Sequence, residues 1–289
     1  MRSRGFRFLS LSMLKGLLFE NLAGQDQDWL DQQLQKICHP PSARNLYLTY
    51  SLIGRKISGE PIEIPAKLDL GDFDFLRGSG IRLNELARIY LLSAALKNNP
   101  AYFVPKVATL IQVSDTGELV TLLRYLMMLP HREEFCETAV EALRTNIATV
   151  FEAISMDNSY PMRYFNEQQW NQMYLKAAFM QLDLLRIQGV EERANAPLSR
   201  IISDYAHERW AASRDVDPHF WRPVSGFLDE VLLKDMGRLL SSANIAEQKA
   251  GFLCCMQSGE PQAKMMLESH PLNEIYQKKP FGWKDLKNE

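Results

Sequence analysis

Residues 114–155 read SDTGELVTLLRYLMMLPHREEFCETAVEALRTNIATVFEAIS, and this stretch decides the fold class. It contains two amphipathic helical segments that separate around Pro130. Asp115 or Ser114 can cap the first segment, because a short polar side chain accepts a hydrogen bond from a free backbone N–H there, and Pro130 ends it. The stretch therefore predicts a helical hairpin of about 40 residues.

Helical periodicity extends outward from this hairpin over the whole chain, and the alternation typical of strands is scarce. The sequence predicts an all-α protein: an irregular α-solenoid of HEAT- or ARM-like helical hairpins, with a compact multi-helix bundle as the alternative. Short links between most helices favour antiparallel neighbours. The predicted helices span residues 6–22, 26–38, 42–57, 82–98, 100–112, 116–129, 133–155, 167–181, 197–213, 217–225, 229–241, 245–257 and 261–269.

The longest interruption is ISGEPIEIPAKLDLGDFDFLRGSG at residues 57–80, which is predicted to be a loop or linker because it is rich in Gly, Pro and Asp. It divides the chain into N-terminal helices with this loop at 1–80, a helical-repeat domain at 81–270 and a C-terminal tail at 271–289. A chain of 289 residues can bury one large core or two smaller ones.

Charge and hydropathy restrict the function classes. The chain has 33 Lys and Arg against 35 Asp and Glu, without a block of like charge, which argues against a nucleic-acid surface. No apolar stretch approaches the roughly 20 residues of a transmembrane helix. The opening segment has a basic start, but Lys15 interrupts its apolar part and no A-x-A-like cleavage site follows, so we expect an amphipathic helix. Weak association of this segment with a membrane surface is left open.

The four cysteines, Cys38, Cys136, Cys254 and Cys255, show neither C-x-x-C pairing nor a metal-finger spacing. They are expected to be reduced core residues of a cytoplasmic protein. We expect no bound metal and no cofactor. The sequence leaves the oligomeric state open.

The richest chemical stretch is DYAHERWAASRDVDPHFWR at residues 204–222. Asp204, His207 and Glu208 fall on one face of a predicted helix, with Arg214 beyond it. Such a face can bind an anion, or move a proton with His207 and one of the two carboxylates as an acid and base pair. A solvated stripe of salt bridges is the alternative.

Familiar catalytic motifs are missing from the sequence. His207-Glu208 does not begin the metalloprotease motif H-E-x-x-H, because position 211 is Ala211. No phosphate-binding loop, dinucleotide fingerprint or G-x-S-x-G elbow occurs. Ordinary nucleotide-binding and serine hydrolase functions therefore lack support.

Polar residues near this helix are candidates for ligand binding. In the predicted helical segment WNQMYLKAAF, Asn171 and Lys176 are the polar residues that can face a pocket. Asn195 can cap the charged helix, which leaves Arg193 free to meet an anion. Trp210 and Trp221 can each be a core anchor or a stacking platform. The predicted ligand-binding residues are Asn171, Lys176, Arg193, Arg209, Trp210 and Arg214.

Five segments together resemble the EboA family: ELVTLLRYLMMLPH, ALRTNIATVFEAISMDNSYP, FNEQQWNQMYLKAAF, ERANAPLSRIISDYAHERWAASR and FWRPVSGFLDE. The resemblance covers roughly residues 82–260, and the order of the segments is its most specific feature. The positions in its most recognisable segments are Asn146, Asp157, Tyr160, Asn171, Lys176, Arg193, Asp204, His207, Glu208, Arg209, Trp210 and Arg214.

The resemblance implies a bacterial protein from an operon that also encodes a UbiA-like prenyltransferase, a TatD-like hydrolase, a dehydroquinate-synthase-like enzyme and a sugar-isomerase-like enzyme. It implies a role in making or exporting a secondary metabolite, and it brings no established reaction. We therefore expect a noncatalytic adaptor or carrier that binds a pathway enzyme or intermediate, the partners being other proteins of the operon or a small metabolite. The alternative is an enzyme of an undescribed class that acts on an anionic or prenylated metabolite with His207.

Overall fold

The computed structural model describes residues 10–268 and 270–286 of the chain. Within these ranges every regular element is a helix, and extended pairing is limited to two isolated bridges, Cys38 with Pro41 and Pro61 with Arg82. The predicted all-α class is confirmed. No helix among the described residues has the length and apolar character needed to cross a membrane.

The chain divides into two compact units, residues 1–154 (unit 1) and 155–289 (unit 2), which are described separately. Unit 1 is built around α5, which packs against α1, α2, α3, α6 and α7. Its helices are α1 (Leu11–Asn21), α2 (Gly24–Cys38), α3 (Ala43–Lys56), η1 (Gly71–Phe73), α4 (Leu76–Ser79), α5 (Leu83–Asn98), α6 (Pro100–Val113), α7 (Thr116–Arg124), η2 (Leu126–Met128), η3 (Arg132–Phe135), α8 (Cys136–Ala142) and α9 (Ala148–Ser155), whose last residue belongs to unit 2.

The core of unit 1 contains a buried ion pair. Arg88 of α5 lies 3.8 Å from Glu118 of α7, and both side chains are almost fully buried. Arg88 Nε also donates to the Tyr50 carbonyl at 3.2 Å. Gly54 makes room for this arrangement, because a Cβ at that position would come within 2.7 Å of Arg88 Nη2. The charges therefore tie α3, α5 and α7 together.

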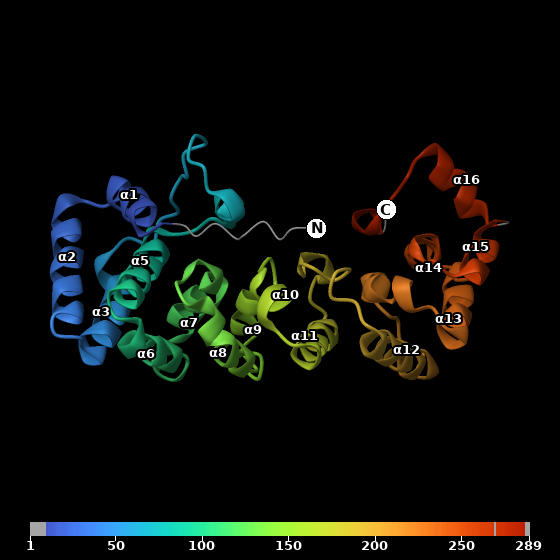
Figure 1. The fold of residues 1–289 in the computed structure, drawn as a ribbon. Coiled ribbons are helices and arrows are strands. Elements are labelled where there is room, and N and C mark those ends of the chain that lie inside the picture. Colours follow the sequence, from blue (N-terminus) through green and yellow to red (C-terminus); the bar gives the residue numbers. More distant parts are fainter. Residues whose placement is uncertain (1–9, 269, 287–289) are drawn as a thin grey trace. The chain divides into compact units, whose positions relative to one another are not determined.

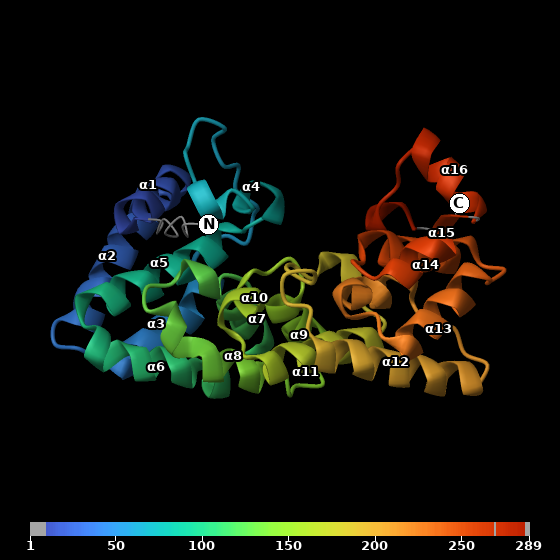
Figure 2. The ribbon, with the colours of Figure 1, turned by 45° about the vertical axis from the view of Figure 1, so that its right-hand side comes forward.

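The long loop between α3 and α5 projects from unit 1 beside α1 (Figures 1 and 2). As predicted, it lacks long helices, although η1 and α4 lie within it. Its conformation is held by Arg77, whose guanidinium donates to the carbonyls of Ile64, Pro65 and Leu68.

Unit 2 is built around α12, α13, α14 and the 3-10 helix η5, which pack against one another (Figure 2). A close approach joins α13 to α14, because a Cβ at Gly251 would lie 2.8 Å from the Leu239 Cβ. The helices of this unit are α10 (Tyr160–Tyr164), α11 (Glu167–Phe179), η4 (Leu184–Arg186), α12 (Ala196–Ala211), η5 (Pro218–Phe227), α13 (Glu230–Leu240), α14 (Ile245–Gln257), α15 (Pro261–Glu268), α16 (Pro271–Lys278) and η6 (Trp283–Asp285).

Several predicted helices differ from the structure. The helix expected at 116–129 ends at Arg124, and η2 follows it. The single helix expected at 133–155 is instead η3, α8 and α9, with a break at 143–147. Residues 218–227 form a 3-10 helix rather than an α-helix, because Pro218 and Pro223 supply no backbone N–H. The tail contains α16 and buries Trp283, and α10 lies in a segment expected to be irregular.

Candidate functional site

The helix α12 carries the charged run and presents it to solvent. Asn195 caps its first turn by accepting a hydrogen bond from the Leu198 N–H at 2.9 Å, as predicted. Leu198, Ile202 and Ala206 form the buried face, whereas Asp204 and Glu208 are exposed. The charged stripe therefore lies on the outside of the helix, where solvent screens it.

His207 is oriented by a buried carboxylate from the next helix. Its Nε2 lies 2.6 Å from Asp235 Oδ1, and the side chains are 47% and 4% exposed, respectively. The other carboxylate oxygen, Oδ2, accepts a hydrogen bond from the Ser203 hydroxyl at 2.5 Å. The acidic partner of His207 is thus Asp235 of α13, rather than Asp204 or Glu208 of its own helix. A carboxylate that fixes one ring nitrogen of a half-exposed imidazole leaves the other nitrogen available for proton transfer.

An aromatic stack continues from His207. The Trp210 ring lies 5.7 Å from the His207 ring and 5.7 Å from the Trp221 ring, the two indoles being nearly parallel at 21°. On Trp210 the Arg238 guanidinium lies 4.1 Å from the ring centre. Since Trp221 is fully buried and Arg238 is a cation over the indole, Trp210 anchors α12 to η5 and α13.

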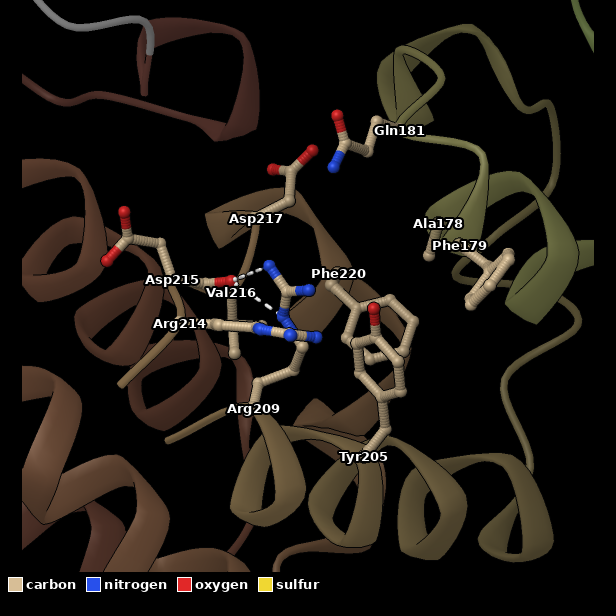
Figure 3. A pocket seen from close by; sticks show the side chains of 10 residues that line it. All are labelled: Ala178, Phe179, Gln181, Tyr205, Arg209, Arg214, Asp215, Val216, Asp217 and Phe220. Atoms are coloured by element: carbon tan, nitrogen blue, oxygen red, sulfur yellow. Dashed lines mark hydrogen bonds between the residues drawn. The ribbon is translucent and has the colours of Figure 1, made fainter. Parts of the chain in front are cut away.

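A pocket of about 590 Å³ lies beside the C-terminal end of α12 (Figure 3). We call it the arginine pocket. Aromatic side chains form one wall: Tyr205 contacts Phe220 edge to face, with 5.2 Å between the rings. Phe179 contributes a ring that is 78% exposed. The residues that line the pocket are Ala178, Phe179, Gln181, Tyr205, Arg209, Arg214, Asp215, Val216, Asp217 and Phe220.

The two arginines of this pocket differ in their contacts. Arg209 donates from Nε and Nη2 to the Asp215 carbonyl, at 3.1 and 2.8 Å, so its guanidinium is fixed in place. Arg214 is exposed, and no hydrogen bond or ion pair joins its side chain to the described residues. In Figure 3 the Asp215 carboxylate points away from the aromatic wall. Arg214 is therefore a cation available to an anionic group in the pocket.

Asp217 and Phe220 are held by neighbouring groups. Asp217 Oδ1 accepts hydrogen bonds from the His219 backbone N–H at 2.8 Å and interacts with the His219 ring at 3.0 Å. Tyr174 stacks on Phe220 at 5.8 Å and 6°, and its hydroxyl donates to the Phe220 carbonyl at 3.3 Å. Complete burial raises the pKa of Tyr174 well above its usual range. The aromatic wall therefore rests on a rigid, uncharged support.

A second pocket, of about 480 Å³, has Arg214 and Asp215 in common with the arginine pocket and is called the Trp210 pocket. Trp210 and Arg238 line it together with Ser213, Ser241, Ser242 and Glu247, and Arg214 and Asp215 line both pockets. Of the predicted ligand residues, Arg209, Trp210 and Arg214 are thus brought close together.

Asn171 and Arg193 lie elsewhere and are engaged in internal contacts. Both polar atoms of the Asn171 amide bond to the Asn195 amide, at 3.0 and 2.8 Å. Arg193 is not free, because it donates to the carbonyls of Met162 and Phe165 at 2.7 and 2.8 Å. Burial lowers the pKa of Lys176. These contacts favour a structural role for Asn171 and Arg193, and their assignment to ligand binding stays a prediction.

The remaining positions of the recognisable segments do not gather around α12. Asn146 is exposed in unit 1. Asp157, which has a positive φ of 50°, pairs with Arg186 at 2.8 Å. Tyr160 is fully buried. Among the described residues, His, Cys, Asp and Glu side chains nowhere form a group of three able to hold a metal ion.

Sequence reasoning missed Asp235, Arg238, Tyr205 and Phe220. Asp235 carried a signal, because it is an acidic residue among the apolar positions Leu232, Leu233 and Met236 of α13. A charge on the buried face of an amphipathic helix requires a partner. The identity of that partner depends on which helix packs opposite, and the sequence does not contain this information.

The fold and the pockets define an all-helical protein with an aromatic-walled pocket that two arginines and two aspartates line. The family model described as metabolite traffic protein EboA matches residues 10–225. This is most of the chain, so the protein belongs to the EboA family, and the match reaches further toward the N-terminus than the resemblance in the sequence. Comparison with curated proteins and with solved structures found no match.

Proposed function

We propose that the protein is a noncatalytic carrier in a bacterial secondary-metabolite pathway and that it binds an anionic aromatic intermediate in the arginine pocket. The observation that carries this proposal is Arg214, an exposed guanidinium that has no partner among the described residues and lies in a pocket that also holds Arg209 and a wall of aromatic rings. Guanidinium groups bind carboxylates and phosphates through charge-assisted hydrogen bonds. Aromatic rings beside them accommodate a planar molecule.

The family description, metabolite traffic protein, supports a carrier over an enzyme. We propose further that the helices form an α-solenoid of HEAT-like hairpins, and that the chain is organised into segments at 1–80, 81–270 and 271–289. The proposed partners are cytoplasmic proteins from the same operon. Packing of consecutive helices, such as α2 with α3 and α13 with α14, supports the hairpin repeat. A solenoid surface would allow the protein to contact a pathway enzyme while it holds the intermediate.

Calorimetric titration with indole-3-acetate and its uncharged counterpart indole-3-acetamide tests the carrier function. We expect the acid to bind at least about tenfold more tightly than the amide, since a hydrogen bond to a charged group contributes about 1.5–3 kcal/mol. Arg214→Gln should weaken binding of the acid by about tenfold or more for the same reason.

Arg200→Gln is the matched control, because Arg200 of α12 is exposed, as Arg214 is, but does not line the arginine pocket. Equal binding of acid and amide, or equal loss in both variants, would contradict the proposal. Phenyl phosphate in the same titration distinguishes a phosphate-bearing ligand from a carboxylate.

A second candidate is an enzyme of an undescribed class in which His207 transfers a proton, and the short His207–Asp235 contact favours it. Asp235 would orient the imidazole, while Arg209 or Arg214 would hold an anionic substrate. If this is so, His207→Gln abolishes the pathway product in cells while the protein remains folded and retains ligand binding. If the protein is a noncatalytic carrier, the same variant retains both the pathway product and ligand binding.

A further inference from the structure

Unit 1 contains a pocket that is unlike those around α12. It has a volume of about 440 Å³ and lies where α1 packs on α5, next to the turn at 128–133. Leu11 and Leu14 of α1 and Met128 form apolar walls, and Ser93 and Lys97 of α5 contribute polar groups. We call it the Ser93 pocket. Its size falls in the usual range for small-molecule sites.

Ser93 is the distinctive group of this pocket. Its side chain lies inside the protein, the residue being 2% exposed, and its hydroxyl has no hydrogen-bond partner among the described residues. Buried hydroxyls nearly always have a partner, because an unmade hydrogen bond in a dry site is unfavourable. A ligand that hydrogen-bonds to Ser93 Oγ would satisfy this group.

The charges of the lining indicate what kind of molecule fits. Lys97 and Glu133 are both exposed and have opposite signs, so together they give the lining no net charge. The buried lining residues, Leu14, Ser93 and Met128, are uncharged, and His131 is the remaining titratable residue of the lining. An ionic group placed among the buried residues would be desolvated without a counter-charge, which is strongly unfavourable.

We propose that the Ser93 pocket is a binding site for an uncharged, mainly apolar small molecule whose single hydroxyl, arylamine or carbonyl group hydrogen-bonds to Ser93. The site is distinct from the arginine pocket in location and in ligand chemistry. It lies within unit 1 and its buried lining residues are uncharged, whereas the arginine pocket belongs to unit 2 and is lined by two guanidinium groups and two carboxylates. The inference does not depend on the proposed carrier function.

Fluorescence of the neutral probe N-phenyl-1-naphthylamine tests the site in the full-length protein. We expect the probe to become fluorescent on binding with 1:1 stoichiometry, and 1-octanol to displace it. Sodium octanoate, which has the same chain length but a charged head, should be at least about tenfold weaker as a competitor, because its carboxylate cannot be buried without a partner.

Two variants locate the binding. Ser93→Ala should weaken 1-octanol about three- to tenfold, as expected for the loss of one neutral hydrogen bond. Leu11→Trp places an indole at the half-buried edge of the pocket and should abolish probe binding. Leu48→Trp is its control, since Leu48 is exposed on α3 and does not line the pocket. Circular dichroism establishes that each variant is folded.

The outcomes separate this site from the arginine pocket. Arg214→Gln should leave probe binding unchanged, even if it also leaves indole-3-acetate binding unchanged and so removes support for the carrier function. Absence of probe binding by the wild type, octanoate competing as well as octanol, or full binding by folded Leu11→Trp would each overturn the proposal.

Discussion

The residue that most constrains the region around α12 is Asp235. Its carboxylate is buried on α13, and both of its oxygens are engaged, one by His207 and one by Ser203. A buried charge is stable only while its partners remain, so removal of a partner leaves desolvated oxygen behind. His207 therefore contributes to stability whatever else it does.

His207→Ala should lower the free energy of unfolding by about 1–3 kcal/mol, because Asp235 Oδ1 then loses its donor. Glu208→Ala, at the next position of the same helix, should change it by less than about 0.5 kcal/mol, because Glu208 is exposed. Urea denaturation monitored by circular dichroism measures both. Equal effects would show that the His207–Asp235 contact does not stabilise the fold.

At the same scale, the sequence identified the helix that carries the candidate site, but it did not identify the residues that contact this helix. The spacing of Asp204, His207 and Glu208 placed them on one face, and the structure agrees that Asp204 and Glu208 share an exposed stripe. The pairing of His207 with Asp235 depends on the packing of α12 against α13. Spacing within one helix does not predict a contact between two helices.

At the scale of elements, the close packing of α14 against α13 depends on a glycine. Gly251 faces α13 so closely that an added Cβ would lie 2.8 Å from Leu239 Cβ. Gly251→Ala should therefore destabilise the protein by about 1–3 kcal/mol despite the better helix propensity of alanine. Gly16→Ala in α1, where a Cβ meets nothing within 4 Å, should instead stabilise by about 0.5–1 kcal/mol. Thermal unfolding measures both variants: the unfolding temperature should fall for Gly251→Ala and rise for Gly16→Ala.

Because two thiols of α14 are buried, we expect the stability of the folded protein to depend on pH. Burial raises the pKa of Cys255 to about 12 and that of Cys254 further, from an ordinary value of 9.0. Above pH 9 the unfolded chain releases these protons while the folded chain retains them, so stability falls as the pH rises. The fall should not exceed about 1.4 kcal/mol per pH unit for each thiol.

Urea unfolding between pH 8 and 10 measures this dependence. The double substitution Cys254→Ala and Cys255→Ala should reduce the slope, because two of the titrating groups are gone. An unchanged slope would show that the α14 thiols do not titrate differently in the two states.

Most helices could be predicted because their apolar periodicity is uninterrupted, as in α5, α6 and α12. The error at 133–155 arose where apolar spacing continued through the polar break at 143–147. The 3-10 geometry of η5 follows from its prolines, which periodicity alone does not register. Turn chemistry and proline position therefore carry information that the hydrophobic pattern lacks.

At the scale of the whole molecule, the chain consists of two compact units with separate polar cores. Unit 1 contains the pair of Arg88 and Glu118, and unit 2 contains Asp235 with its donors and the bidentate pair of Arg222 and Glu191, at 3.0 Å for both contacts. Each network lies within its own unit. A substitution in one of these networks should therefore lower the local stability of its own unit first.

Arg88→Met should lower the stability of unit 1 by about 3–5 kcal/mol, since Glu118 would remain as a buried, unpaired charge. Hydrogen exchange followed by mass spectrometry should show faster exchange in α3, α5 and α7, with unchanged exchange in α13 and α14. The double variant Arg88→Met with Glu118→Gln should recover part of the loss. Equal acceleration in both units would show that they unfold as one cooperative body.

The shared wall formed by Arg214 and Asp215 has a further consequence. These two residues line both the arginine pocket and the Trp210 pocket. A molecule that repositions Arg214 in one pocket therefore alters the charge and shape of the other. Thermodynamic linkage makes this influence reciprocal: if occupancy of the first pocket changes affinity at the second, occupancy of the second changes affinity at the first by the same factor. If both pockets bind ligands, this two-residue segment therefore couples their affinities.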